Sequence, residues 1–86
     1  MLLVIVNLSA KGSTFPLEAL QEVDLALEVV GLKKQVRSVL VPGKQFSTTY
    51  EGPSVEKNRV EETLKPLAER SQITFSVETE ESVSFP

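Results

Sequence analysis

The hydrophobic pattern in the first third of the chain predicts a strand followed by a helix. Residues 2–6 are apolar at both parities and rich in β-branched side chains, which is typical of a strand covered on both faces. After a polar loop, Thr14 is a candidate helix cap and Pro16 suits the first helical turn. An apolar stripe at helical spacing then continues until Gly31, which favours the end of a helix. The stripe consists of Leu17, Leu20, Val23, Leu27 and Val30.

The middle of the chain predicts a β-hairpin. Residues 35–41 are rich in valine and leucine, and residues 44–51 alternate between aromatic or threonine positions and small polar ones. Pro42 and Gly43 lie between them and supply the backbone angles of a tight turn. The alternation indicates that Phe46 and Tyr50 point toward the same face of the sheet, where we expect the helices to lie.

The last third predicts a second helix and a final strand. Ser54 is a candidate cap for a helix over residues 55–70, and Pro66 is expected to bend or divide that helix on its solvent side. Residues 73–78 alternate between apolar and polar side chains, as a strand with one buried face does. Residues 80–86 extend this strand, form an extra edge strand or remain a tail.

The order strand, helix, strand, strand, helix, strand predicts an α+β fold of the ferredoxin-like, split βαβ type. Such a fold has a four-stranded antiparallel sheet with both helices on one face and the first and third strands in the middle. The 86 residues are enough for one small domain with one core, so we expect residues 1–86 to form a single unit.

Two pairs of aliphatic residues fall where this fold does not bury them. On a helical wheel Leu25 and Val29 lie outside the main stripe, on the outward face of the first helix. Leu3 and Ile5 point away from the strand neighbours that face the helices, so the other side of the sheet needs a cover. A second copy, a protein partner or the folded-back C-terminal residues would provide it. We therefore predict a homo-oligomer, most simply a dimer, or a complex with a protein partner.

The charge distribution adds a second candidate surface. The chain has a formal net charge of -3, yet no carboxylate lies between Glu28 and Glu51. The basic residues of that segment are Lys33, Lys34, Arg37 and Lys44. They indicate either an edge strand that positive charge protects from pairing, or a hairpin that binds an anion or RNA. Lys11, in the loop before the first helix, is a further candidate anion ligand.

Composition narrows the possible chemistry. The chain contains neither cysteine nor histidine, so the commonest nucleophile, general base and transition-metal ligands are missing. The adjacent acids at 61–62 and 80–81 have no third ligand in sequence and are typical of solvated surfaces. We expect no catalytic residues, no metal and no cofactor. The absence of a signal-peptide pattern and of a span of about 18 apolar residues predicts a cytoplasmic protein without a membrane segment.

Together these features favour a non-enzymatic interaction or regulatory module that associates with itself. The alternative is an anion-binding or RNA-binding module that uses the basic hairpin. One RNA-binding version of this fold stacks bases on aromatic residues of its central strands, and the first strand here has none. We therefore rank nucleic acid second among the partners.

Overall fold

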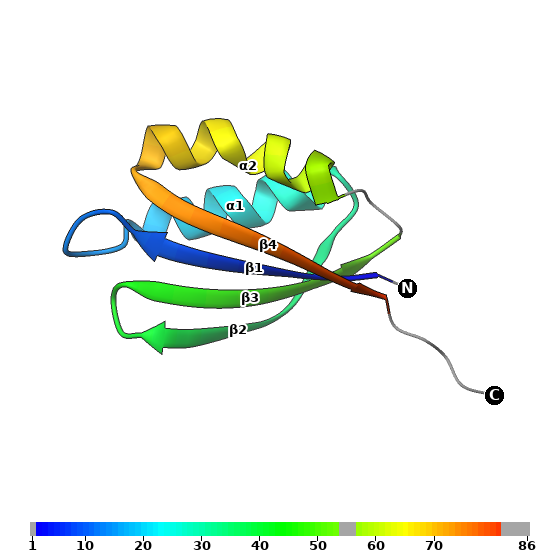
Figure 1. Cartoon of the computed structure of the whole chain (residues 1–86), viewed down its shortest axis with the longest axis horizontal. Coiled ribbons are helices and arrows are strands. Elements are labelled where there is room, and N and C mark those ends of the chain that lie inside the picture. Colours follow the sequence, from blue (N-terminus) through cyan, green and yellow to red (C-terminus); the bar gives the residue numbers. More distant parts are fainter. Residues whose placement is uncertain (1, 54–56, 82–86) are drawn as a thin grey trace.

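The computed structural model describes residues 2–53 and 57–81, which form a four-stranded antiparallel sheet with two helices on one face (Figure 1). The elements are β1 (Leu2–Ala10), α1 (Leu17–Val29), β2 (Lys33–Val41), β3 (Gln45–Gly52), α2 (Lys57–Ser71) and β4 (Ile73–Glu81). The strand order is β2-β3-β1-β4, so β1 and β3 are central and β2 and β4 are the edges. The predicted ferredoxin-like fold is confirmed.

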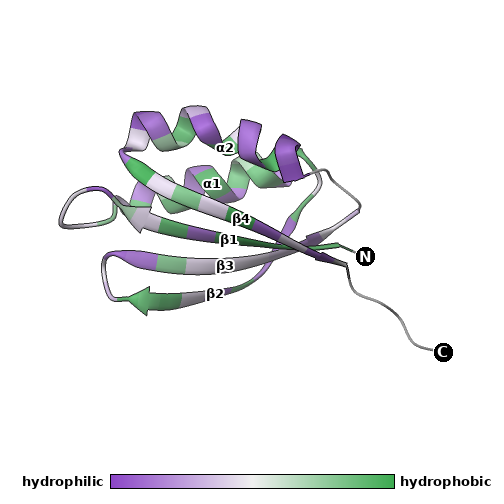
Figure 2. Cartoon of the chain, in the orientation of Figure 1, coloured by the Kyte–Doolittle hydropathy of each residue, from purple (hydrophilic) through white to green (hydrophobic). Residues whose placement is uncertain are grey.

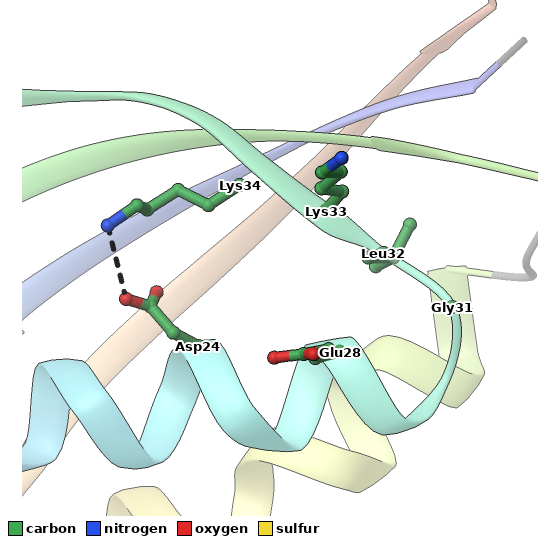
Figure 3. Close-up of a pocket in the computed structure, with 6 residues that line it drawn as sticks. All are labelled: Asp24, Glu28, Gly31, Leu32, Lys33 and Lys34. Atoms are coloured by element: carbon green, nitrogen blue, oxygen red, sulfur yellow. Dashed lines mark ion pairs between the residues drawn. The ribbon is translucent and has the colours of Figure 1, made fainter.

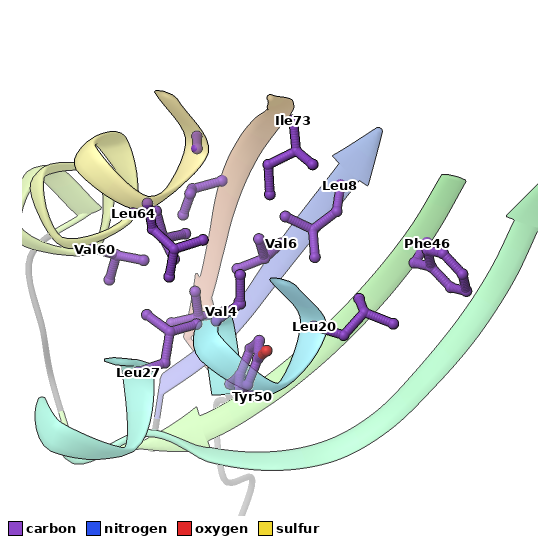
Figure 4. Close-up of a cluster of buried hydrophobic side chains, with 14 of the residues drawn as sticks. Val4, Val6, Leu8, Leu20, Leu27, Phe46, Tyr50, Val60, Leu64 and Ile73 are labelled. Carbon is purple, nitrogen blue, oxygen red and sulfur yellow. The ribbon is translucent and has the colours of Figure 1, made fainter. Parts of the chain in front are cut away.

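One apolar core fills the space between the sheet and the helices (Figure 4). In β1 the even-numbered side chains are buried, whereas Leu3 and Ile5 are half-buried on the opposite face of the sheet. Phe46 and Tyr50 of β3 point to the helices, as their parity predicted. The sheet thus has one face that carries the core and one open face, which no helix covers in the part of the chain that the structure describes.

The start of α1 differs from the prediction. The cap position is Pro16, with extended backbone angles, and no side chain caps the helix, so Thr14 does not act as a cap. Phe15 is buried and stacks edge to face with Phe46, and this anchors the chain one residue before the helix cap. Leu17 was expected in the core, but 69% of its surface is exposed, because the core side of the helix is centred on other positions. The buried residues of α1 are Ala19, Leu20, Val23 and Leu27.

The end of α1 is set by Gly31, as predicted. Its φ of 94° lies in the left-handed region that side chains disfavour. The backbone N–H of Gly31 donates to the carbonyl of Glu28 at 2.9 Å, and that of Leu32 donates to the carbonyl of Leu27 at 2.9 Å. This pair of hydrogen bonds is a Schellman motif, and the buried side chains of Leu27 and Leu32 complete it.

The predicted hairpin is formed by β2 and β3, with β2 starting two residues earlier than expected. The N–H of Lys44 donates to the carbonyl of Val41 at 2.9 Å, and Gly43 has a φ of 74°. Proline followed by a left-handed glycine is the arrangement of a type II turn. The N–H of Phe15 donates to the carbonyl of Gly43 at 2.8 Å, so the loop before α1 is attached to this turn.

The second helix continues through Pro66, which is exposed, so the proline does not divide it. The predicted cap at Ser54 lies outside the described residues. β4 pairs with β1 along its length to Glu81, so residues 80 and 81 extend the last strand, and residues 82–86 lie outside the description. Within residues 2–53 and 57–81, neither helix has the length and apolar character needed to cross a membrane.

We predict that Gly52→Ala destabilises the fold by about 1–3 kcal/mol, since a forced side chain in a closely packed site strains its surroundings. A Cβ at Gly52 would lie 2.7 Å from the carbonyl oxygen of Gly31 and 2.9 Å from the side chain of Leu32. Denaturant unfolding measures the change. Gly12→Ala is the control, because a Cβ there meets nothing within 4 Å. Equal unfolding free energies for the two variants would contradict the prediction.

Candidate functional site

A single carboxylate on α1 organises the polar contacts between that helix and the hairpin. Asp24 accepts a hydrogen bond from the Tyr50 hydroxyl at 2.6 Å and pairs with the Arg37 guanidinium at 2.5 Å. Arg37 also donates from Nε to Oγ1 of Thr48 at 3.1 Å. The Lys34 ammonium lies 3.6 Å from the second oxygen of Asp24. Three elements, α1, β2 and β3, are therefore joined through one side chain.

This network closes the border of the core next to β2. Tyr50 and Thr48 are fully buried, whereas Asp24 and Arg37 keep about a quarter and a fifth of their side-chain surface exposed. No buried side-chain nitrogen or oxygen among the described residues lacks a partner. Burial, together with the hydrogen bond and the negative charge of Asp24, raises the pKa of Tyr50 well above its usual range. The phenol is thus held neutral, as a structural hydrogen-bond donor.

The basic residues of the hairpin take different positions and do not form one cluster. Lys34 and Arg37 point to the helix side and pair with Asp24. Lys33 lies on the open face, where its register partner in β3 is Glu51. The carboxylate that the segment lacks in sequence is therefore supplied by α1.

The two remaining candidate anion ligands lie at the other end of the hairpin. Lys44 belongs to the β2–β3 turn, and Lys11 follows β1 in a neighbouring loop, since the N–H of Ala10 donates to the carbonyl of Lys44 at 2.9 Å. They are separated from Lys33 by the length of β2. Anion binding by these lysines stays a prediction, and the geometry provides two separated positions rather than one surface.

A shallow pocket of 470 Å³ lies where α1 connects to β2 (Figure 3). It is lined by Asp24, Glu28, Gly31, Leu32, Lys33 and Lys34. Lys34 reaches across it to Asp24, whereas Lys33 points away from the helix (Figure 3). Charges of both signs line the pocket, and the Asp24 carboxylate is already paired with Lys34 and Arg37. In residues 2–53 and 57–81 no three acidic side chains converge as metal ligands would.

The four predicted partner-binding residues lie on two separate faces. Leu25 and Val29 are 63% and 87% exposed on the side of α1 that points away from the sheet. Leu3 and Ile5 lie on the open face of the sheet and are half-buried. The fold does not bring these two pairs together. Leu25 and Val29 are exposed, and Leu3 and Ile5 lie on the face of the sheet that the sequence predicted. Partner binding by these four residues stays a prediction.

The neighbours of Leu3 and Ile5 on the open face of the sheet are acidic. Leu3 lies between Glu51 of β3 and Glu80 of β4, and Ile5 is opposite Glu78 of β4. Packing two copies of this face against each other would bring rows of carboxylates together, and burying unpaired charges is costly. The open face is therefore the less favourable of the predicted contact surfaces.

A third apolar surface was missed in the sequence. It lies on the edge strand β2, whose C-terminal half is strongly apolar (Figure 2). The exposed aliphatic residues there, which we call the β2 edge patch, are Val36, Val39, Leu40 and Val41. The sequence signal for this patch was the run of consecutive apolar residues 39–41. Such a run is typical of a strand covered on both faces, whereas β2 is an edge strand.

Comparison with known proteins shows the fold and no more. No protein-family model matches this sequence, and neither does any curated protein. The structure is similar to a formyltetrahydrofolate deformylase from Pseudomonas putida KT2440, with a TM-score of 0.58 and 7% sequence identity. The similarity covers 91% of this chain and 28% of the deformylase chain. The chain is thus similar in fold to a minor part of a larger enzyme, and the shared fold is the ferredoxin-like α+β arrangement.

We predict that Asp24→Asn destabilises the fold by about 1.5–3 kcal/mol, since it removes a charged hydrogen-bond acceptor from the Arg37 guanidinium. Chemical denaturation measures the loss. Glu22→Gln is the matched control on the same helix, because Glu22 and Arg70 form an ion pair at 3.1 Å in which both side chains are well exposed. Such surface pairs contribute about 0–1 kcal/mol. A loss for Asp24→Asn no larger than that of the control would show that the network is not structural.

The raised pKa of Tyr50 predicts loss of stability in alkali. The folded state holds the phenol proton more tightly than the unfolded chain does, so this stabilisation is complete below about pH 10 and is lost as the pH rises further. Unfolding free energies between about pH 9 and about pH 11 should fall more steeply for the native chain than for Tyr50→Phe. The chain has one tyrosine and no tryptophan, so tyrosinate absorbance reports Tyr50 alone. A free phenol titrating near pH 10 in the folded protein would contradict the structure.

Proposed function

We propose that this protein is a small non-enzymatic interaction or regulatory module that associates with itself. The observation that carries the proposal is the number of large aliphatic side chains left at the surface of so small a domain. They lie on α1 and β2 and are Leu17, Leu25, Val29, Val36, Val39, Leu40 and Val41. Scattered exposed aliphatics are common, but contiguous ones mark interaction surfaces.

The polar chemistry of the described residues supports binding rather than catalysis. An acid–base or nucleophilic site requires two positioned titratable groups with access to a substrate. The most perturbed group, Tyr50, is fully buried with its proton donated to Asp24, and Asp24 is itself paired with Arg37. The pocket beside them is shallow and carries opposite charges. The Asp24, Arg37 and Tyr50 network therefore has a structural role. In this proposal, function depends on the exposed aliphatic residues of α1 and β2.

The similarity to part of a deformylase is in keeping with this proposal. A minor share of a larger chain matches the whole of this small domain. A fold that is used as one unit of a larger protein is suited to a role in contacts or regulation, although a shared fold by itself assigns no function.

We further propose that the protein is cytoplasmic, which is the location that its sequence predicts.

The anion-binding alternative receives less support from the geometry. Arg37 and Lys34 are bound to Asp24, so two of the five candidate cations already have a carboxylate. Polyanion binding depends on several cations that neutralise neighbouring phosphates, and its strength falls steeply with salt. A salt-sensitive complex with heparin or RNA at low ionic strength would restore this alternative.

We predict a concentration-dependent dimer. Sedimentation and light scattering should give a mass that rises from one to two chains with concentration, and the thermal midpoint should rise in parallel because association stabilises the folded state. The reason is burial of exposed aliphatic surface, whose stabilisation scales with the apolar area removed from water. A single-chain mass at every concentration up to the millimolar range would overturn the proposed function.

A further inference from the structure

We infer that the β2 edge is the site at which a second copy of this chain binds, by pairing β2 with β2 in antiparallel orientation around Ser38. Two four-stranded sheets would then form one continuous sheet of eight strands with all helices on one side. This inference rests on the self-association proposed above. It adds the location of the contact, the orientation of the two copies and the residues that meet.

The middle of β2 lacks the usual protection of an edge strand. An edge presents unpaired backbone N–H and C=O groups, and natural proteins protect it with short strands, charges, proline, β-bulges or a covering element. β2 has nine residues, and its two register shifts against β3 lie toward its ends, so Val36–Val39 is regularly paired. Among the described elements none lies along its outer side. Its Arg37 does not protect the edge, because the guanidinium is bound to Asp24 on the helix side. Lys33 and Lys34 protect one end only.

The apolar side chains of β2 are distributed over both faces of the strand. Val39 is opposite Phe46 of β3 and so lies on the helix side. Val36 is opposite Thr49 on the open side, and Leu40 lines a hollow together with open-face residues such as Asn7. A partner placed on one face of the sheet would cover only some of these side chains. An added strand covers both sets, because its own side chains also alternate between the faces.

The positive charges at one end of β2 favour an antiparallel orientation of the two copies. With two parallel β2 strands, Lys33 and Lys34 of both copies would lie side by side, and like charges placed opposite each other destabilise a sheet. The antiparallel orientation places the two lysine pairs at opposite ends of the contact. Val36, Val39 and Leu40 of both copies then lie near the two-fold axis, where water is excluded most fully.

The alternation of side chains between the two faces of β2 restricts the register of the pair. Residues directly opposite in a sheet share a face, so a continuous sheet must pair open-face residues with open-face residues. A register centred on Arg37 would place two guanidiniums opposite each other. The irregularity between Val39 and Val41 shifts the faces, so a register centred on Val39 would oppose residues of different faces. Centring on Ser38 keeps the faces matched from Val36 to Leu40 and leaves a small side chain on the two-fold axis.

In this register the open-face aliphatic residues nearest the axis are opposite each other, whereas Val41 is opposite Gln35. Val36 of one copy is opposite Leu40 of the other, and both are 55% exposed in the single chain. Leu17 borders the same edge on the helix layer, because it lies about 20° around α1 from Asp24, whose carboxylate reaches β2. Its exposed side chain is therefore on the side where the helix of the second copy would lie.

Cross-linking through Ser38 tests the register directly. The chain has no cysteine, so Ser38→Cys introduces the sole thiol. Opposite residues in an antiparallel pair have Cα atoms about 4.5–5.5 Å apart, within the range that a disulfide spans. We expect mild oxidation to convert most of this variant into a covalent dimer. Ser76→Cys, exposed on the other edge strand β4, is the matched control and should cross-link at least about ten-fold more slowly.

Charge insertion tests the edge independently. We expect Val36→Lys with Leu40→Lys to weaken dimerisation at least ten-fold, because the new ammonium groups would lie opposite each other across the axis. Leu25→Lys with Val29→Lys is the control, with the same added charge at exposed aliphatic positions on α1, and should leave the dimer unchanged. All four positions are at least 55% exposed, so both variants should retain the native circular dichroism spectrum.

The possible results separate this inference from the proposed function. If the native chain dimerises but only the α1 variant dissociates it, the contact is the Leu25–Val29 surface, and the β2 inference is overturned while the proposed function stands. Equal cross-linking of the Ser38→Cys and Ser76→Cys variants would also overturn it. A native chain that is monomeric at every concentration overturns both.

Discussion

The pairing of Asp24 with Arg37 is the contact on which the surface properties of this molecule depend. It attaches α1 to β2, gives the buried hydroxyl of Tyr50 an acceptor, and neutralises the centre of a segment that contains no carboxylate of its own. A charged pair at the border of a core is stabilising only when hydrogen bonds satisfy both groups, and here Thr48 receives the second bond from the guanidinium. Because Asp24 holds the Arg37 guanidinium on the helix side, the positive charge in the middle of β2 does not face the edge of the sheet.

Local signals in the sequence were sufficient for the fold. The run of apolar residues 2–6 marked a strand with neighbours on both sides, and β1 is indeed central. Pro42 with Gly43 defined the turn, and Gly31 defined the end of the first helix, because each requirement concerns backbone angles within a few residues. These features are independent of the rest of the chain, so they can be read without knowing the tertiary structure.

The candidate surfaces depended on contacts between distant segments, and there the sequence was less informative. Asp24 is one of several acids on a helix, and nothing local distinguishes it until β2 and β3 bring Arg37 and Tyr50 beside it. Leu17 has the right spacing for the core stripe, yet the helix begins at that residue and the core side is rotated away from it. The apolar end of β2 has the composition of an inner strand, and only the strand order makes it an edge.

The opposite edge of the sheet has a different chemical character, and this bears on how far assembly can proceed. Glu78 and Glu80 are exposed on β4, so two such edges would repel each other, and neither offers an aliphatic surface comparable to that of β2. In a two-fold pair each copy uses its own β2, and both outer borders become acidic. If the β2 pair that we infer forms, the asymmetry between the two edges favours a closed assembly of defined size over the open-ended growth that apolar strand edges otherwise promote.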